Sequence, residues 1–330
     1  MPDRNASAAL FGYDFQARAA IVIMLDNIKE AKSIKLEGEE DIEVLLKDGN
    51  RILAQAKSTV RIDDFSKSRE KLNSALISLS EGAAKVPATQ LILITNSPNP
   101  FNDDNSRPLF WGPCKVRYHE LPKSSQDLVQ NYLKDIKESL DPEMFTVQRI
   151  PFHSDDEKER SKAIKESINE FLGTISVTTP GLAGKLYDVW TSQLFFNGTV
   201  REKAFHMSKE SFIWPIIVIE TDIENVDEEL RDEFDEALYN DITRLYHEII
   251  DTHCEHYEFI TKVLSDYNSF QGNRKTKATD FAKSAWDKYV EEFDVPGIDA
   301  DTQKNLTIVI LYSIVRRWTT IERIRKGASL

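Results

Sequence analysis

The segment from Leu36 to Ser58 constrains the fold more than any other part of the sequence, because it reads as two short strands joined by a turn. Residues 41–46 and 51–57 each alternate polar and apolar side chains. The residues between them, Asp48-Gly49-Asn50, are types that tolerate positive φ angles. We therefore predict a β-hairpin in this segment.

The predicted hairpin carries polar side chains that a plain hairpin does not need. Alternation puts Asp41 and Glu43 on one face of the first strand. It also puts Gln55 and Lys57 on one face of the second. Burying such groups is costly unless they bind something. Oxygen donors can hold a hard cation, and a lysine can polarise a water molecule or stabilise a charged phosphate. The pattern therefore indicates metal-dependent hydrolysis of a phosphodiester.

Periodicity predicts the elements around the hairpin in the order helix, strand, hairpin, helix, strand. The flanking elements are a helix over 8–28, a strand over 33–37, a helix over 63–82 and a buried strand over 90–95. This is the core order of α/β domains of the restriction-endonuclease-like class. We predict such a domain at the N-terminus, followed by an α-helical C-terminal domain.

The residues of the hairpin also carry a family resemblance. Asp41, followed by Gln55-Ala56-Lys57, resembles the core of the PD-(D/E)xK nuclease superfamily, with Gln in the second acidic position. Two preceding segments sharpen the likeness: Gly12–Gln16 (GYDFQ), which opens a helix, and Glu37–Ile42 (EGEEDI). Together they resemble the double-stranded DNA endonuclease domain of nucleotidyltransferase-linked (CBASS) antiphage systems, which also serves as the nuclease subunit of Lamassu-type defence complexes. The resemblance covers about the first half of the chain.

The resemblance implies roles for particular residues. A Mg²⁺ or Mn²⁺ ion is expected on Asp41, Gln55 and the backbone carbonyl of Ala56. Lys57 is expected to align the attacking water or to stabilise the phosphate. Gln16 is expected to face the site, although periodicity alone favours a solvent-exposed helix residue. Three further acids are candidates for the rim of the site, and the sequence leaves open which of them contributes: Glu37, Glu39 and Glu43.

Composition and charge limit the classes of function. The chain has 330 residues, of which 41% are hydrophobic, and only two cysteines, which suits a globular protein of the reducing cytoplasm. We expect neither a membrane span nor a secretion signal. The net charge of −13 argues against broad nucleic-acid binding and against tight DNA binding by an isolated monomer. Residues 51–100, however, hold seven Lys/Arg against four Asp/Glu.

The second half of the sequence reads as almost wholly helical. We place the domain boundary after residue 176, which gives a nuclease domain over 1–176 and a helical domain for partner binding or oligomerisation over 177–330. The predicted helices span 184–196, 237–270, 279–293 and 302–326. The apolar run 212–219 contains Pro215 and fits either a buried extended segment or a helix broken at Trp214. An acidic stretch runs from Glu220 to Glu236, and no ATPase motif is present.

The family resemblance, together with Gln55 in place of an acid, leads to expectations about partners and function. The family implies a complex with an SMC-like ATPase and a small accessory subunit, which hold the nuclease inactive. Because Gln55 lowers the negative charge of the site, activity is expected to need assembly of several copies on double-stranded DNA. Two alternatives remain open: a catalytically silent nuclease-fold binding or adaptor subunit, and an RNase of the same fold. The intact set of Asp41, Gln55 and Lys57 favours the nuclease.

Overall fold

The computed structural model describes residues 7–153, 156–199, 206–221, 236–252, 257–272, 276–293 and 297–330. The contacts divide the chain into two compact units. The first comprises Met1–Thr174 and Ala183–Lys209, and the second comprises Ile175–Leu182 and Glu210–Leu330. Most of the acidic stretch noted in the sequence, residues 222–235, lies outside the described residues.

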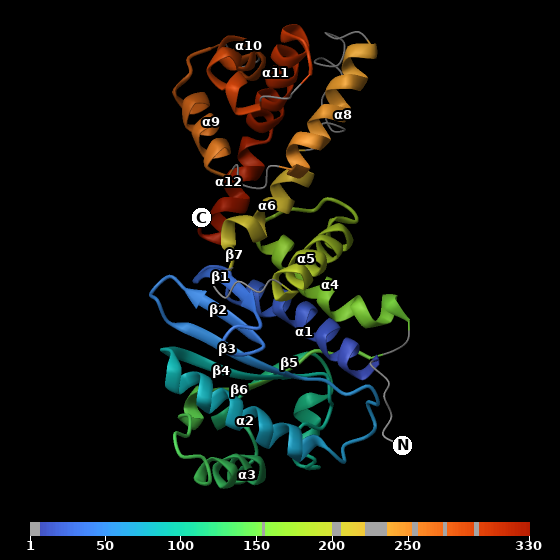
Figure 1. The fold of residues 1–330 in the computed structure, drawn as a ribbon, viewed down its shortest axis with the longest axis vertical. Coiled ribbons are helices and arrows are strands. Elements are labelled where there is room, and N and C mark those ends of the chain that lie inside the picture. The colour runs from blue at the N-terminus through green and yellow to red at the C-terminus, as the bar shows by residue number, and fades with distance from the viewer. Residues whose placement is uncertain are drawn as a thin grey trace. The chain divides into compact units, whose positions relative to one another are not determined.

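The first unit is built on a mixed sheet of seven strands (Figure 1). In spatial order the strands are β5 (Cys114–Arg117), β6 (Phe145–Arg149), β4 (Ala88–Thr95), β3 (Arg51–Lys57), β2 (Ile42–Leu46), β1 (Ala31–Leu36) and β7 (Met207–Ser208). β3 pairs with β4, and β4 with β6, in parallel, whereas the other neighbours are antiparallel. The parallel centre requires crossovers, and the helices of the unit supply them.

Helices cover both faces of this sheet. Figure 1 shows α1 (Ser7–Asp26) and α4 (Glu157–Thr174) on one side, and α2 (Ser68–Lys85) and α3 (Lys123–Lys134) on the other. Three short 3₁₀ helices lie in the connections: η1 (Arg107–Phe110), η2 (Tyr118–Glu120) and η3 (Pro142–Met144). The predicted order of helix, strand, hairpin, helix and strand is confirmed. The chain is an α/β domain followed by helices.

The hairpin forms where it was predicted. The N–H of Leu46 donates to the carbonyl of Asn50 at 2.8 Å, and Gly49 adopts a φ of 88°. The backbone N–H of Asn50 donates to the Asp48 carboxylate at 2.9 Å, which closes the turn. The three turn residues thus behave as their types predict. The register pairs Ile42 with Ala54.

One face of α2 packs against the sheet and forms a core with it. Leu72, Leu76 and Leu79 of α2 are fully buried and belong to one cluster with Leu53 of β3 and Leu91 of β4. Burying each such side chain contributes roughly 1.5–3 kcal/mol to folding. α2 is therefore held firmly against β3, the strand that carries Gln55 and Lys57.

The start of α2 differs from the prediction, which placed it at residue 63. The chain after β3 is instead tied to the end of β4: the Thr59 N–H donates to Asn96 Oδ1, and Asn96 Nδ2 donates to the Thr59 carbonyl, each at 2.8 Å. These bonds hold residues 59–67 as a connection, and the helix begins at Ser68.

α1 is more apolar than the sequence analysis allowed. Among the described residues it is the one helix whose length and mean hydropathy of 1.3 meet the criteria for a membrane span. More than half of it is buried within the protein, and core helices of soluble proteins meet the same criteria. Phe15, Ala19, Ile23 and Met24 are buried on one side of α1, whereas Phe11 at the start of that side is partly exposed.

α5 (Leu182–Thr199) belongs largely to the first unit, whereas the predicted boundary after residue 176 assigned it to the second. Asn197 Oδ1 accepts a hydrogen bond from the N–H of Leu36 in β1 at 3.0 Å. The Tyr13 hydroxyl donates to the Phe195 carbonyl at 3.2 Å. These bonds join positions more than 160 residues apart, so a change in composition along the chain does not reveal them.

The second unit is helical in its described part. Its elements are α6 (Lys209–Glu220), α8 (Glu236–Thr252), α9 (Tyr257–Ser269), α10 (Lys277–Tyr289), η5 (Val290–Phe293), α11 (Ala300–Arg316) and α12 (Trp318–Ala328). The predicted helix over 302–326 is wrong, because the chain breaks at Arg317 between α11 and α12. The predicted helix over 237–270 covers α8 and α9, and residues 253–256 between them lie outside the described residues. Pro215 lies inside α6, so the apolar run is helical and continuous rather than extended or broken at Trp214.

Candidate active site

Asp41 lies in a tight turn between β1 and β2. The Glu37 N–H donates to the Asp41 carbonyl at 3.1 Å, and Glu37 has a φ of 54°, in the left-handed region that few non-glycine residues adopt. Gln16 of α1, only 6% exposed, fastens this turn: its Nε2 donates to the Asp41 carbonyl at 2.7 Å and to Glu37 Oε1 at 2.9 Å. Gln16 is therefore committed to the turn that presents Asp41.

The Asp41 carboxylate meets the end of β3. Its Oδ2 accepts the N–H of Ala56 at 2.8 Å and a second hydrogen bond from Gln55 Nε2. In a strand the N–H and C=O of one residue point to the same edge, so the Ala56 carbonyl lies on the same edge of β3 as the N–H that Asp41 accepts. Burial raises the pKa of Asp41 to about 6, although the Ala56 N–H and the Lys57 charge act in the opposite direction. Three oxygen-bearing groups thus converge: Asp41, Gln55 and Ala56.

Lys57 supplies positive charge beside this group. It follows Gln55 by two positions on β3 and is half-exposed. Its positive charge acts to lower the pKa of Asp41, against the larger effect of burial. In the described part of the chain Lys57 forms no ion pair with a carboxylate. Its ammonium is therefore available to a ligand.

The converging groups fit a hard cation, although with few carboxylates. The described residues contain no group of three or more His, Cys, Asp or Glu side chains that could hold a metal ion. The set here has another composition: one carboxylate, one amide and one backbone carbonyl, all of which are oxygen ligands of the kind that Mg²⁺ accepts. Gln55 now presents nitrogen to Asp41, and a half-turn of its amide would present oxygen instead.

Two of the three acids that the sequence left open point elsewhere. Glu43 pairs with Arg51 at 2.7 Å and accepts the Glu39 N–H at 3.1 Å. This position depends on Gly38, because a Cβ there would lie 2.5 Å from Glu43 Oε2. Glu39 pairs with Lys85 at 3.3 Å. Of the three, only Glu37 is joined to Asp41, through Gln16 and through its charge, which raises the pKa of Asp41.

Glu40 is a site residue that the sequence analysis missed. Although it precedes Asp41 in an acidic turn, it is only 5% exposed, and both carboxylate oxygens accept from Ser78 Oγ of α2, at 2.9 and 3.1 Å. Gly82 makes room for it, since a Cβ there would lie 2.8 Å from Glu40 Oε1. Burial raises the pKa of Glu40 to about 7. The signal available in the sequence was the pair Ser78 and Gly82, two small residues four positions apart on α2 that leave room for a buried side chain.

We expect Glu40 to make stability fall as pH rises. Its folded-state pKa lies above the ordinary 4.5, so the stabilising proton is fully held below about pH 4.5 and is lost as pH rises through about 7. Glu40→Gln keeps an acceptor for Ser78 and removes this loss. The variant's free energy of unfolding minus that of the wild type should therefore be larger at about pH 8 than at about pH 5, by up to about 3 kcal/mol. Urea unfolding measures it.

The matched control for this prediction is Glu81→Gln, on an exposed position of α2. It should leave the pH dependence of the free energy of unfolding as in the wild type. An equal gain for Glu40→Gln at both pH values would mean that Glu40 does not titrate as described.

Comparisons with protein-family models, with curated proteins and with solved structures found no match to this chain.

Proposed function

We propose that this protein is a metal-dependent double-stranded DNA endonuclease with a restriction-endonuclease-like core of the PD-(D/E)xK type. One observation carries the proposal: Asp41, brought to the end of β3 by its turn, meets Gln55 and the backbone of Ala56, with Lys57 beside it. Such a set unites oxygen ligands with a cation at one point, as phosphodiester hydrolysis requires.

Each residue has a role in this proposal. Asp41, Gln55 and the Ala56 carbonyl would hold Mg²⁺ or Mn²⁺, which lowers the pKa of bound water and neutralises phosphate charge. Lys57 orients the attacking water or stabilises the charge that develops on the phosphate. Gln16 keeps the Asp41 turn in place from α1. Its own side chain is committed to that turn, so it acts through Asp41.

A catalytically silent binding subunit is the second candidate, and one observation favours it. Oδ2 of Asp41 is already engaged by two N–H donors of the protein, Ala56 and Gln55. A site with one carboxylate so engaged binds a cation more weakly than a site with two acids. The same observation fits a nuclease that stays inactive until it is assembled.

The deciding experiment is a cleavage assay on supercoiled plasmid with Mg²⁺, Mn²⁺ or EDTA. The protein is tested alone and together with the products of its neighbouring genes, and a duplex RNA is run in parallel. We expect metal-dependent cutting of DNA that rises with the concentration of the protein, because copies must assemble, and that falls when the restraining partners are added. Cutting of RNA alone identifies an RNase of the same fold, and no cutting under any condition favours the silent subunit.

We further propose a cytoplasmic complex in which an SMC-like ATPase and a small accessory subunit restrain the nuclease until copies of it assemble on DNA. The described helices of the second unit support a role in protein contacts. The last of them, α12, places Arg323 and Arg325 on intramolecular partners, the Ser176 carbonyl at 3.2 Å and Glu322 at 2.7 Å. These arginines thus act within the unit rather than as a free basic surface for DNA.

A fragment of residues 1–209 should fold and retain the metal site but should not co-purify with the partner subunits. It includes α5, whose bonds to β1 and α1 the predicted domain 1–176 would lose, so 1–176 should unfold at a lower temperature. Circular dichroism compares the two fragments, and pull-down compares 1–209 with the full chain. Partner binding by 1–209 as tight as by the full chain would mean that the first unit, not the second, carries the partner-binding surface.

A further inference from the structure

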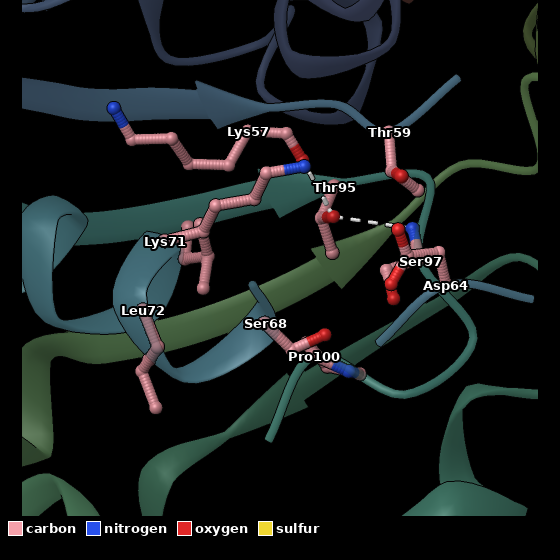
Figure 2. A pocket seen from close by; sticks show the side chains of 10 residues that line it. Lys57, Thr59, Asp64, Ser68, Lys71, Leu72, Thr95, Ser97 and Pro100 are labelled. Carbon is pink, nitrogen blue, oxygen red and sulfur yellow. Dashed lines mark hydrogen bonds between the residues drawn. The ribbon is translucent and has the colours of Figure 1, made fainter. Parts of the chain in front are cut away.

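A small pocket lined by both polar and apolar side chains, Lys57 among them, lies where β3 and β4 end and α2 begins (Figure 2). It has room for about one water-sized group, with a volume of about 20 Å³. The polar residues that line it and matter here are Thr59, Asp64, Ser68, Lys71, Thr95 and Ser97. A space of this size takes a single oxygen atom or water molecule, not a base or an organic cofactor.

Lys71 brings a positive charge to this pocket without a carboxylate partner. Its Nζ donates to the Ser58 carbonyl at 2.6 Å, which uses one of three N–H donors. It forms no ion pair within the described part of the chain. Burial, and then the charge of Lys67, lower the pKa of Lys71. A half-buried ammonium with donors to spare is an unfavourable arrangement unless an anion joins it.

The surroundings of Lys71 favour an anion. The 18-residue helix α2 begins at Ser68, a residue that lines the pocket. Its N-cap, Lys67, makes no side-chain capping bond, so the positive end of the helix dipole has no side-chain cap at this position. Asp64 is the one acid among the lining residues, and it is exposed. Its Oδ1 already accepts the N–H of Ser66 at 3.0 Å and the Ser66 hydroxyl at 2.6 Å. Its charge is therefore screened by solvent and by these bonds.

Lys57 and Lys71 lie next to each other but point apart. Figure 2 shows the Lys57 side chain running along β3 away from Lys71, while Lys71 reaches from α2 towards the end of the strand. Thr95 fixes this end, since its Oγ1 donates to the Lys57 carbonyl at 2.7 Å. The two ammonium groups therefore cannot serve the same phosphate oxygen, and each has a position of its own.

We propose that this pocket is a second phosphate subsite, in which Lys71 binds an oxygen of the DNA backbone phosphate next to the one attacked at Asp41 and Lys57. The inference rests on the proposed nuclease function and deepens it, because it names a contact that positions the substrate strand. Lys71 is a positioning residue: it holds the neighbouring phosphate and does not touch the reacting one.

Salt dependence of DNA binding tests this subsite without any need for cleavage. Binding of a short fluorescent duplex is measured in EDTA between about 50 and 200 mM salt, for the wild type, Lys71→Met and Lys71→Arg. The control is Lys137→Met, at an exposed position after α3. We expect Lys71→Met to reduce the slope of log K against log salt by about 0.9, the value of one phosphate contact. Lys71→Arg and Lys137→Met should keep the wild-type slope.

The outcomes separate this proposal from the nuclease proposal. If the wild type binds DNA but does not cut it with Mg²⁺, and Lys71→Met reduces the slope, the phosphate subsite is supported and the nuclease proposal is contradicted. An unchanged slope for a Lys71→Met protein that melts as the wild type does overturns the subsite while cleavage stands. A wild type that does not bind duplex DNA overturns both. Should Lys71→Met unfold, the slope is measured for Lys71→Gln instead: a slope reduced by about 0.9 supports the proposal, and an unchanged slope overturns it.

Discussion

Lys57→Ala should slow Mg²⁺-dependent DNA cleavage by at least about 100-fold, the usual cost of removing one preorganised charge-stabilising donor. The reason lies in its position. Lys57 is the cation next to Asp41, and among the described residues its ammonium forms no ion pair with a carboxylate. The substitution should leave the fold intact, because the side chain is half-exposed and its loss opens no core cavity. Plasmid nicking and circular dichroism on the same preparation measure both effects.

Two further variants make this result specific. Lys137→Ala removes an equal charge from an exposed position after α3 and should cut at the wild-type rate. Lys57→Arg keeps the charge but changes its geometry, so partial recovery of the rate is expected. Full cutting by a well-folded Lys57→Ala protein would remove Lys57 from the mechanism.

The hairpin could be predicted because its signals are local. Alternation and the turn residues around Gly49 fix it within a few positions, and its register follows from the turn. The convergence of Asp41 with Gln55 follows from that register, since Ile42 pairs with Ala54 and the next positions come opposite each other. This part of the candidate site was therefore contained in the sequence pattern.

Other parts depend on contacts that the pattern does not encode. Glu40 accepts from Ser78 across 38 positions, and this contact makes it a buried residue rather than one more acid of an exposed turn. A lysine such as Lys71 within a helix next to other basic residues is usually solvent-exposed, but its ammonium donates to the Ser58 carbonyl instead. The ends of helices were also missed, as at Arg317 between α11 and α12, where apolar periodicity continues through the break.

Asp41→Asn should abolish detectable Mn²⁺ binding, with loss of metal-dependent cutting. The wild-type carboxylate is the only one in the proposed ligand set, and a neutral amide cannot replace its charge. The amide oxygen of Asn can take the place of Oδ2, which alone accepts the N–H groups of Ala56 and Gln55, so the substitution removes the charge while keeping an acceptor for both donors. Isothermal titration with Mn²⁺ measures the loss, and thermal unfolding checks the fold.

The pH dependence of wild-type binding tests the same carboxylate independently. Burial raises the pKa of Asp41 to about 6, so protons compete with the cation as pH falls through that value. Mn²⁺ affinity should be highest above about pH 7 and should drop by about tenfold for each unit below about 6. Glu39→Gln is the matched control, because Glu39 pairs with Lys85 instead of facing the site, and it should bind Mn²⁺ normally. Unchanged binding by Asp41→Asn would move the cation to Glu37 or Glu40, the two acids that the turn holds nearest to Asp41, and the Gln variants of these two would then identify the ligand.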